Sequence, residues 1–178
     1  MSFEKLSRQK FRRYFQPTRI LLGVVPFKEK RRANLITLCF SMYSSYRPNV
    51  MAIAVQKPYL SNELFRSCDD FVLAIPGEEI ADQTLQCGIV SGRDRDKVES
   101  FGFRLKKSKR VKTPSLEGVI ANIECKKIGE IDVGDHTLFL GEVKGFYVDK
   151  DNEQRCLLSV GPDHKGYKVL ARIIHEAA

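Results

Sequence analysis

Residues 119–148 read VIANIECKKIGEIDVGDHTLFLGEVKGFYV, and they contain the two longest β-type stretches of the chain. The first runs from Val119 to Ile131 and the second from Thr137 to Val148. The residues between them, Asp132 to Asp135, include the Asp and Gly that a hairpin connection favours. The sequence therefore predicts a long β-hairpin, beside which further strands can pair.

Shorter apolar or alternating runs, broken by charged or Pro-containing segments, occupy much of the remaining chain. They predict strands over Ile20–Val25, Asn34–Phe40, Asn49–Val55, Phe71–Ile75 and near Cys156–Val160. Helical spacing predicts short helices over 61–65, 78–87 and 94–101, one near the N-terminus with Phe3, Leu6, Phe11 and Tyr14 on one side, and one from about Gly166 that carries Val169, Leu170, Ile173 and Ile174. Strands dominate, so we expect a mainly β fold whose sheet closes into a barrel.

The composition is that of an ordinary globular domain, with 178 residues, 43% apolar and 29% charged. One compact domain is expected. No apolar run approaches the ~20 residues that a membrane span requires, and the charged N-terminus lacks the apolar core of a signal peptide. We therefore expect a cytoplasmic protein that does not associate with membranes.

The five cysteines are odd in number, widely spaced and never form a Cys-x-x-Cys pair. This pattern argues against a disulfide framework and against a structural zinc site. The three histidines are also far apart, so the sequence predicts no metal site.

The net charge of +8 is unevenly distributed, because residues 1–32 hold ten Lys and Arg against two Glu. We therefore treat residues 1–16 as a basic N-terminal helix or arm and residues 17–178 as the main domain. A second basic run comprises Arg104, Lys106, Lys107, Lys109, Arg110 and Lys112. Basic runs are usually solvated surface, and no aromatic-rich motif accompanies either one, so nucleic-acid binding is the less favoured interpretation.

A small-residue turn at residues 87–97 reads CGIVSGRDRDK and leads into the start of a helix. Ser91 and Gly92 can expose backbone amides and a hydroxyl, and Arg93 and Lys97 add positive charge. These groups predict an anion-binding turn. An ordinary loop followed by a capped helix would contain the same residue types, so this second interpretation stays open.

Helix-start residues add to this picture. Ser61 precedes a short helix and can cap its free amides, and the same position can contribute to an anion site. Asp94 and Asp96 alternate with Arg93, Arg95 and Lys97, so we expect them to stabilise a helix start and to pair with those cations.

Further short segments occur in a fixed order along the chain. They are Asn34-Leu35-Ile36-Thr37, Ser45-Tyr46-Arg47-Pro48, Ser61-Asn62-Glu63-Leu64, the run from Asp70 to Pro76, Ile123-Glu124-Cys125, and the run from Gly134 to Val143. Together with the turn at 87–97, their order and spacing resemble the flavin reductase-like proteins with an FMN-binding split barrel, including the flavoredoxin group. The resemblance covers about residues 18–150, and the joint order is far more specific than any single segment.

The resemblance implies a six-stranded Greek-key split β-barrel with short flanking helices, formed by residues 17–178 and assembled as a homodimer. It also implies that FMN, or FAD as the alternative, binds in a groove near the subunit interface. The expected function is an oxidoreductase that transfers a hydride from NADH or NADPH to the flavin. The reduced flavin would then pass electrons to an acceptor such as ferric iron or a partner protein.

Roles for individual residues also follow from the resemblance. The FMN phosphate would be held by Ser61, Ser91, Gly92, Arg93 and Lys97, and the flavin ring would be lined by Thr37, Cys39, Ser41 and Ser45, with Asn34 and Gly88 completing the cofactor-binding residues. His136 would be the catalytic residue, close to the flavin face where the nicotinamide stacks. The sequence also allows Cys39 to be a small core residue and His136 to be structural.

Four dipeptides depart from the family's usual pattern. They are Val25-Pro26 in place of Val-Thr, Cys39-Phe40 in place of Ser-Trp, Pro48-Asn49 in place of Pro-Pro, and Gln56-Lys57 in place of Arg-Pro. An altered flavin affinity or orientation therefore stays open. A flavin-binding electron shuttle or storage protein without its own NAD(P)H site is the alternative function.

Overall fold

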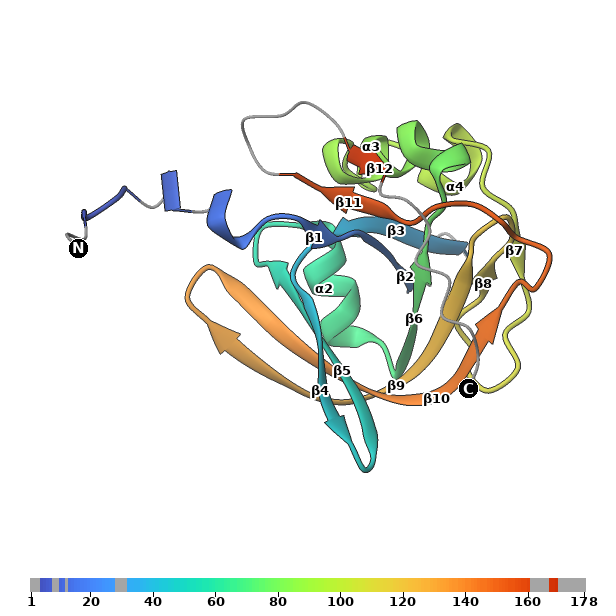
Figure 1. The fold of residues 1–178 in the computed structure, drawn as a ribbon. Coiled ribbons are helices and arrows are strands. Elements are labelled where there is room, and N and C mark those ends of the chain that lie inside the picture. The colour runs from blue at the N-terminus through green and yellow to red at the C-terminus, as the bar shows by residue number, and fades with distance from the viewer. Residues whose placement is uncertain (1–3, 8–9, 12, 28–31, 161–166, 170–178) are drawn as a thin grey trace.

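The structure is a computed structural model that describes residues 4–7, 10–11, 13–27, 32–160 and 167–169. Its main element is an antiparallel sheet with the strand order β3-β2-β6-β9-β10-β5-β4, which curves around an internal helix (Figure 1). The strands are β2 (Leu21–Phe27), β3 (Arg32–Leu38), β4 (Ser41–Tyr46), β5 (Asn49–Gln56), β6 (Asp70–Ile75), β9 (Ala121–Val133) and β10 (His136–Val148). The predicted strands over 20–25, 49–55 and 71–75 correspond to β2, β5 and β6.

The predicted hairpin is confirmed as β9 and β10, which pair from Val133 opposite His136 to Ala121 opposite Val148. Only Gly134 and Asp135 separate the two strands, so the connection is shorter than the four residues expected. Gly134 has a φ of +57°, a left-handed conformation that glycine adopts without a steric penalty.

Strand β2 is apolar throughout because both of its faces are covered. Leu21 and Val25 belong to the inner core, whereas Leu22 and Val24 belong to an outer core on the other face of the sheet. A strand that is buried on both sides needs apolar residues at successive positions, and this explains the unbroken run in the sequence. The sheet therefore has one packed face inside the barrel and another beneath the outer helices.

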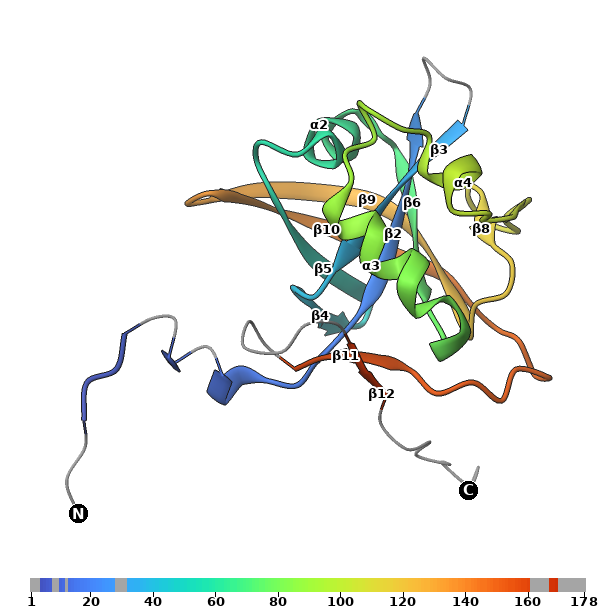
Figure 2. The same cartoon turned by 90° about the horizontal axis from the view of Figure 1, so that it is seen from above.

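Helix α2 (Leu60–Ser67) lies inside the curve of the sheet, where Phe65 packs against Phe71 and Phe139 with ring centroids 5.3 Å apart in each pair. Helices α3 (Ala81–Ile89) and α4 (Lys97–Ser100) cover the opposite face, over β2 and β3 (Figure 2). The short helix η3 (Glu78–Ile80) precedes α3. The predicted helix over 78–87 is thus divided in two, and the one predicted over 94–101 shrinks to the four residues of α4.

The main sheet has seven strands rather than the expected six. The strand predicted over Asn34–Phe40 ends at Leu38, and after Cys39 and Phe40 the chain continues as β4, which pairs with β5. Alternation of apolar and polar residues does not reveal β4, because most of its side chains are exposed.

Two small sheets complete the fold. One contains β1 (Thr18–Arg19), β11 (Leu157–Ser159) and β12 (Tyr167–Val169), and the other contains β7 (Leu105–Lys106) and β8 (Ser115–Leu116). The expected helix from about Gly166 is wrong for residues 167–169, because they pair with β11 as a strand and gain their hydrogen bonds there. Leu170, Ile173 and Ile174 lie outside the described residues.

The expected N-terminal helix is formed only in part in the described residues of the arm. Leu6 is not helical, Lys10 and Phe11 are helical, with the Phe11 amide donating to the Ser7 carbonyl oxygen at 2.9 Å, and residues 13–15 form the short helix η1. Phe11, Tyr14 and Phe15 are at least half exposed and pack mainly on one another. Without an apolar surface to dock on, so short a helix has little to stabilise it. Phe3 lies outside the described residues, and the domain boundary at residues 16 and 17 stays a prediction.

Candidate functional site

A cavity of about 340 Å³ lies between β3, the start of α2, the end of α3 and the turn that follows α3. Seven of the predicted cofactor-binding residues line it: Thr37, Ser61, Gly88, Ser91, Gly92, Arg93 and Lys97. They are joined by Ile36, Pro58, Tyr59, Leu60, Cys87, Ile89 and Val90. Segments that are up to sixty residues apart in the chain thus meet around one hollow.

Lys97 is the most buried cation of this cavity, with 5% of the residue exposed. Its ammonium donates hydrogen bonds of 2.8 Å to the carbonyl oxygen of Leu35 on β3 and of 2.8 Å to that of Cys87 on α3. No carboxylate of the described residues forms an ion pair with it. An ammonium has three N–H donors, so one remains for a ligand in the cavity.

Burial lowers the pKa of the Lys97 ammonium from its ordinary value, because desolvation disfavours the charged form. A buried charge without an opposite charge is costly, and an anion in the cavity would offset that cost. Lys97 is therefore the residue that most strongly indicates an anionic ligand.

Helix α2 presents its N-terminus to the same cavity through Tyr59, Leu60 and Ser61. Tyr59 is the N-cap residue, and its side chain forms no capping hydrogen bond. The first amides of a helix without a side-chain cap favour an anion, both by hydrogen bonding and through the helix dipole.

The expectation that Ser61 caps this helix is wrong, because the helix begins at Leu60 and Ser61 lies in its first turn. The Ser61 hydroxyl instead accepts a hydrogen bond of 2.8 Å from the side-chain amide of Asn34. Asn34 is absent from the lining of the cavity but fixes one of its walls, since it links β3 to α2.

Two glycines allow the backbone to approach closely here. A Cβ on Gly92 would lie 2.1 Å from Asn34 Oδ1, and a Cβ on Gly88 would lie 3.2 Å from Thr37 Cβ. The Thr37 hydroxyl donates to the carbonyl oxygen of Thr84 on α3. Small residues at 88 and 92 therefore bring α3 and its following turn against β3.

The turn is closed locally by Ser91, whose hydroxyl accepts a hydrogen bond of 3.1 Å from the Arg93 amide. The Arg93 guanidinium forms an ion pair with Glu63 of α2 and donates weakly, at 3.4 Å, to the carbonyl oxygen of Pro58. About half of the Arg93 side chain is exposed at the rim of the cavity, and its charge is already paired with Glu63. Arg93 therefore indicates an anionic ligand less strongly than Lys97 does.

Asp96 holds Lys97 in place from the start of α4. Its carboxylate accepts hydrogen bonds from the amides of Val98 and Glu99, as predicted for a helix start. Its cationic partner is Arg32 of β3, however, and not Arg93, Arg95 or Lys97 as expected. The pairing differs because α4 packs on β3, which brings Arg32 next to the cap.

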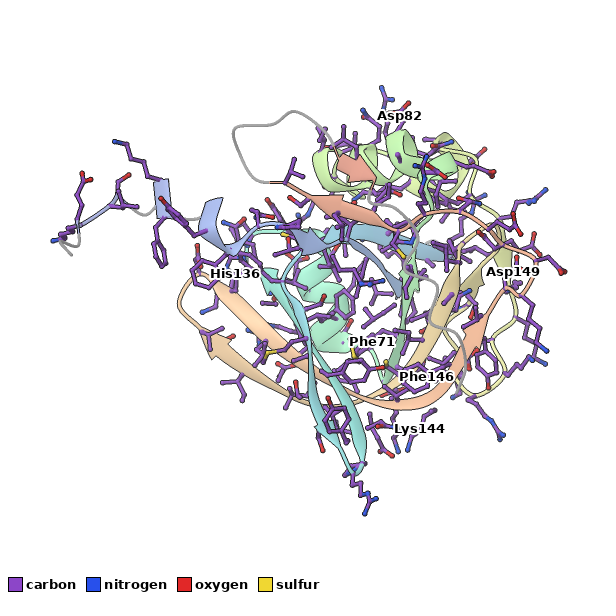
Figure 3. The ribbon with its side chains drawn as sticks, in the orientation of Figure 1. Phe71, Asp82, His136, Lys144, Phe146 and Asp149 are labelled. Atoms are coloured by element: carbon purple, nitrogen blue, oxygen red, sulfur yellow. The ribbon has the colours of Figure 1, made fainter. Side chains whose placement is uncertain are left out.

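The other predicted residues lie beyond the cavity: Cys39, Ser41 and His136 lie near the point where β3 passes into β4, whereas Ser45 lies at the far end of β4, opposite Val50. Cys39 follows β3, and Ser41 and Ser45 belong to β4. His136 lies at the start of β10, with its ring 5.5 Å from that of Phe40, and its Nδ1 is 2.7 Å from Asp135 Oδ1 (Figure 3). Contact with Phe40 places His136 beside the segment that contains Cys39 and Ser41.

Sequence reasoning missed the groups that bind Lys97, because they are main-chain carbonyls of Leu35 and Cys87. It also missed Tyr59 and Leu60, which line the cavity because α2 begins there. No particular type of residue marks either a main-chain carbonyl ligand or this helix start in the sequence. A lysine at the start of a short helix after a Ser-Gly turn is the only pattern that points to this geometry.

Among the described residues, no group of three or more His, Cys, Asp or Glu side chains could hold a metal ion. No helix in the same part of the chain is long and apolar enough to cross a membrane.

The five cysteines carry free thiols. Burial raises the pKa of the Cys87 thiol, which lines the cavity, to about 12, so this thiol is not a reactive thiolate near neutral pH.

Comparison with known proteins shows which family the chain matches. A family model described as "Flavin reductase like domain" matches residues 12–165, which is most of the chain. The match includes every residue of the cavity and also His136.

Solved structures with the same fold share little sequence with this chain. A flavoredoxin from Methanosarcina acetivorans has a TM-score of 0.83 at 21% identity, over 99% of this chain and 96% of the other. An FMN-binding protein from Thermus thermophilus has a TM-score of 0.81 at 18% identity, over 98% and 99%. The NADH:FAD oxidoreductase SgcE6 from Streptomyces globisporus has a TM-score of 0.78 at 18% identity, over 97% and 100%. These likenesses confirm the predicted mainly β split-barrel fold.

The close approach at Gly92 predicts that Gly92→Ala destabilises the protein by about 1–3 kcal/mol, because the new methyl group would overlap Asn34. Urea unfolding measures this change. Gly129→Ala is the matched control, since its Cβ would make an ordinary contact of 3.8 Å and should change stability by less than about 0.5 kcal/mol. In an Asn34→Ala background, Gly92→Ala should lower the free energy of unfolding by less, because the atom that the new methyl group would overlap is gone. If the effects of the two substitutions on the free energy of unfolding simply add, this account is contradicted.

Proposed function

The chain belongs to the flavin reductase-like family, and from this premise we propose that it binds FMN and transfers a hydride from NADH or NADPH to it. The observation that carries this proposal is the buried Lys97 ammonium, which has carbonyl partners on β3 and α3 but no carboxylate partner among the described residues. An FMN phosphate, with close to two negative charges, would supply the missing opposite charge. FAD remains a possible ligand of the same site.

The cavity fits a phosphate in three independent ways. Lys97 offers a charged donor, the start of α2 offers amides without a side-chain cap, and Gly92 lets the turn approach without a side chain in the way. Ser61, Ser91 and Arg93 add polar groups at the lining. Charge-assisted hydrogen bonds of this kind are about twice as strong as neutral ones, which suits a doubly charged group.

The flavin ring would extend from the phosphate towards the junction of β3 and β4. Thr37 lines the cavity, and Cys39 and Ser41 follow it along the chain on either side of Phe40, whose ring contacts His136. Ser45 lies further along β4, opposite Val50, so it would contact the ring least directly. Backbone groups of this segment would bind the polar edge of the ring. When bound, the flavin supplies the electron-accepting chemistry, so the protein has to position it and exclude water.

His136 would contact the nicotinamide of the hydride donor. Asp135 binds its Nδ1, which fixes the orientation of the ring and leaves Nε2 for a ligand. About one fifth of the side chain is exposed, so Nε2 stays within reach of a molecule stacked near Phe40. The role of His136 is therefore to orient the donor, and no acid-base pair is required.

We further propose that the protein is a homodimer and that the sheet face around β4 contributes to its interface. Tyr43 and Tyr46 of β4 are at least half exposed, and their rings lie 6.1 Å apart. Phe146 of β10 is nearly half exposed and packs beside Tyr43. A cluster of exposed aromatic rings is typical of an interface.

The cytoplasmic location expected from the sequence stays a prediction.

An electron-shuttle or storage protein that binds flavin without a nicotinamide site is the second candidate function. The departure at Cys39 favours it, since Cys39 lies between β3 and β4 beside the proposed ring site. Pro26 and Asn49 also depart from the family's usual residues, but they lie away from that site, opposite Ala33 of β3 and opposite Tyr46 of β4. Pyridine nucleotide distinguishes the two functions, because only a reductase accepts a hydride from it.

Replacing Lys97 with Met should weaken FMN binding at least about tenfold, because one charge-assisted hydrogen bond to the phosphate is lost. Riboflavin, which has no phosphate, should lose much less affinity. Flavin fluorescence titration measures both affinities. Lys112→Met, which removes an exposed cation elsewhere, is the control and should leave both nearly unchanged. Equal losses for FMN and riboflavin in the Lys97 variant would contradict the phosphate assignment.

The purified protein should be yellow, or become yellow with FMN, and should bleach anaerobically when NADH or NADPH is added. His136→Asn should slow this reduction by roughly tenfold through poorer positioning of the donor, and should leave the FMN dissociation constant unchanged. Stopped-flow absorbance follows the bleaching. A flavin spectrum that stays oxidised would support the shuttle function, and failure to bind any flavin would exclude both.

A further inference from the structure

A basic loop connects β7 and β8 and begins nine residues after Lys97, the last of the cavity residues in the chain. We call residues 106–112, which read KKSKRVK, the basic loop. It contains five cations and no carboxylate, and all five cationic residues are exposed. The proposed oxidoreductase function uses none of them.

Two carboxylates of the main sheet, the buried Glu124 and the partly exposed Asp70, hold the backbone of this loop. Glu124, only 1% exposed, accepts hydrogen bonds from the amides of Lys109 and Arg110, at 2.9 and 2.6 Å. Asp70 accepts from the amides of Lys112 and Thr113, at 3.1 and 2.8 Å. These carboxylates bind main-chain amides, so they hold the loop in one conformation while its cationic side chains remain at the surface.

The cations of the loop are not paired with acidic side chains in the part of the chain that the structure describes. Lys109 instead places its ammonium over the ring of Tyr147, 4.7 Å from the centroid. The nearby Arg104, by contrast, pairs with Glu117 at 3.2 Å. A fixed loop with unpaired positive charge is ready to bind an acidic surface without a large ordering cost.

Two hollows border the basic loop and extend its charged surface onto β9 and β10. One, of about 800 Å³, is lined by Lys106, Lys107 and Lys109 and also by Phe146 and Asp149. The other, of about 360 Å³, is lined by Arg110 and Val111 together with Lys126 and Lys144. Figure 3 shows Lys144, Phe146 and Asp149 at the opposite end of β10 from His136.

We propose that the basic loop and its two hollows bind an acidic segment of a partner protein. The lysines and Arg110 would pair with its carboxylates, and Val111 would contact an apolar side chain between them. This surface shares no residue with the cavity proposed for FMN, so the inference does not rest on the flavin chemistry.

A protein segment fits this surface better than a nucleic acid does. The hollows also contain Asp69, Asp149 and Asp151, whose carboxylates can accept hydrogen bonds from the backbone amides of a polypeptide, whereas a phosphodiester backbone has no N–H donors to offer them. The nearest aromatic rings are also engaged, since Tyr147 lies beneath Lys109 and Phe146 packs beside Tyr43. Few rings are thus free to stack with bases.

The test uses the full chain and two probes with the same number of negative charges, a poly-L-glutamate peptide and a single-stranded oligothymidylate. The variant K106E/K107E/K112E reverses charge on the basic loop. The control K5E/K10E/R47E makes the same change in net charge at exposed positions elsewhere. Fluorescence anisotropy at several salt concentrations measures binding, and the FMN affinity of each variant reports whether the cavity is intact.

We expect the natural protein to bind poly-L-glutamate more tightly than oligothymidylate. The loop variant should lose at least about tenfold in affinity for the peptide, whereas the control should lose less than about twofold. Equal losses in the two variants would show attraction by net charge alone and overturn the proposal. Tighter binding of oligothymidylate, lost in the loop variant, would overturn it in favour of a nucleic-acid site. If the triple variant does not fold, the double variant K107Q/K112Q, which removes two positive charges instead of reversing three, tests the proposal by the same comparison of affinities.

Discussion

The burial of one ammonium group, that of Lys97, is the constraint on which the candidate site depends. Two carbonyl oxygens, on β3 and α3, bind it, so it joins the sheet to the outer helix layer at a single point. Asp96 and Arg32 fix the helix that carries it, and Gly88 and Gly92 allow the necessary close packing. None of the described carboxylates pairs with this buried cation, so an anionic ligand in the cavity would offset the cost of burying its charge.

The double burial of the sheet explains how the cavity can exist at this place. Inside the barrel, Phe65, Phe71 and Phe139 form a packed core around α2. Outside it, Leu22, Val24 and Leu35 pack beneath α3 and α4. The cavity lies where the start of α2 meets the end of α3, so both layers contribute to it. Its shape follows from the packing of two apolar layers against one sheet.

The sequence predicts most of the strands and the hairpin, because long apolar alternation is a strong signal there. Seven residues that line the cavity are also predicted, but through the resemblance to the family, because Ser, Gly, Arg and Lys in a turn are equally typical of an ordinary loop before a capped helix. The sequence does not predict β4, whose side chains are mostly exposed, or the carbonyl oxygens that bind Lys97, which any residue type supplies. The start of α2 at Leu60 is likewise decided by packing rather than by Ser61. Long-range features such as the Arg32–Asp96 pair join residues whose spacing in the chain carries no signal.

NMR titration of the Lys97 ammonium, in protein labelled at lysine, tests the central claim most directly. Burial lowers the pKa of this group in the free protein, and a bound dianion favours the charged form. We therefore expect FMN to raise the pKa of Lys97, and riboflavin to leave it unchanged. By linkage, FMN affinity should then fall as pH rises through the pKa of Lys97 in the free protein. FMN that binds tightly without changing the pKa of Lys97 would contradict this account.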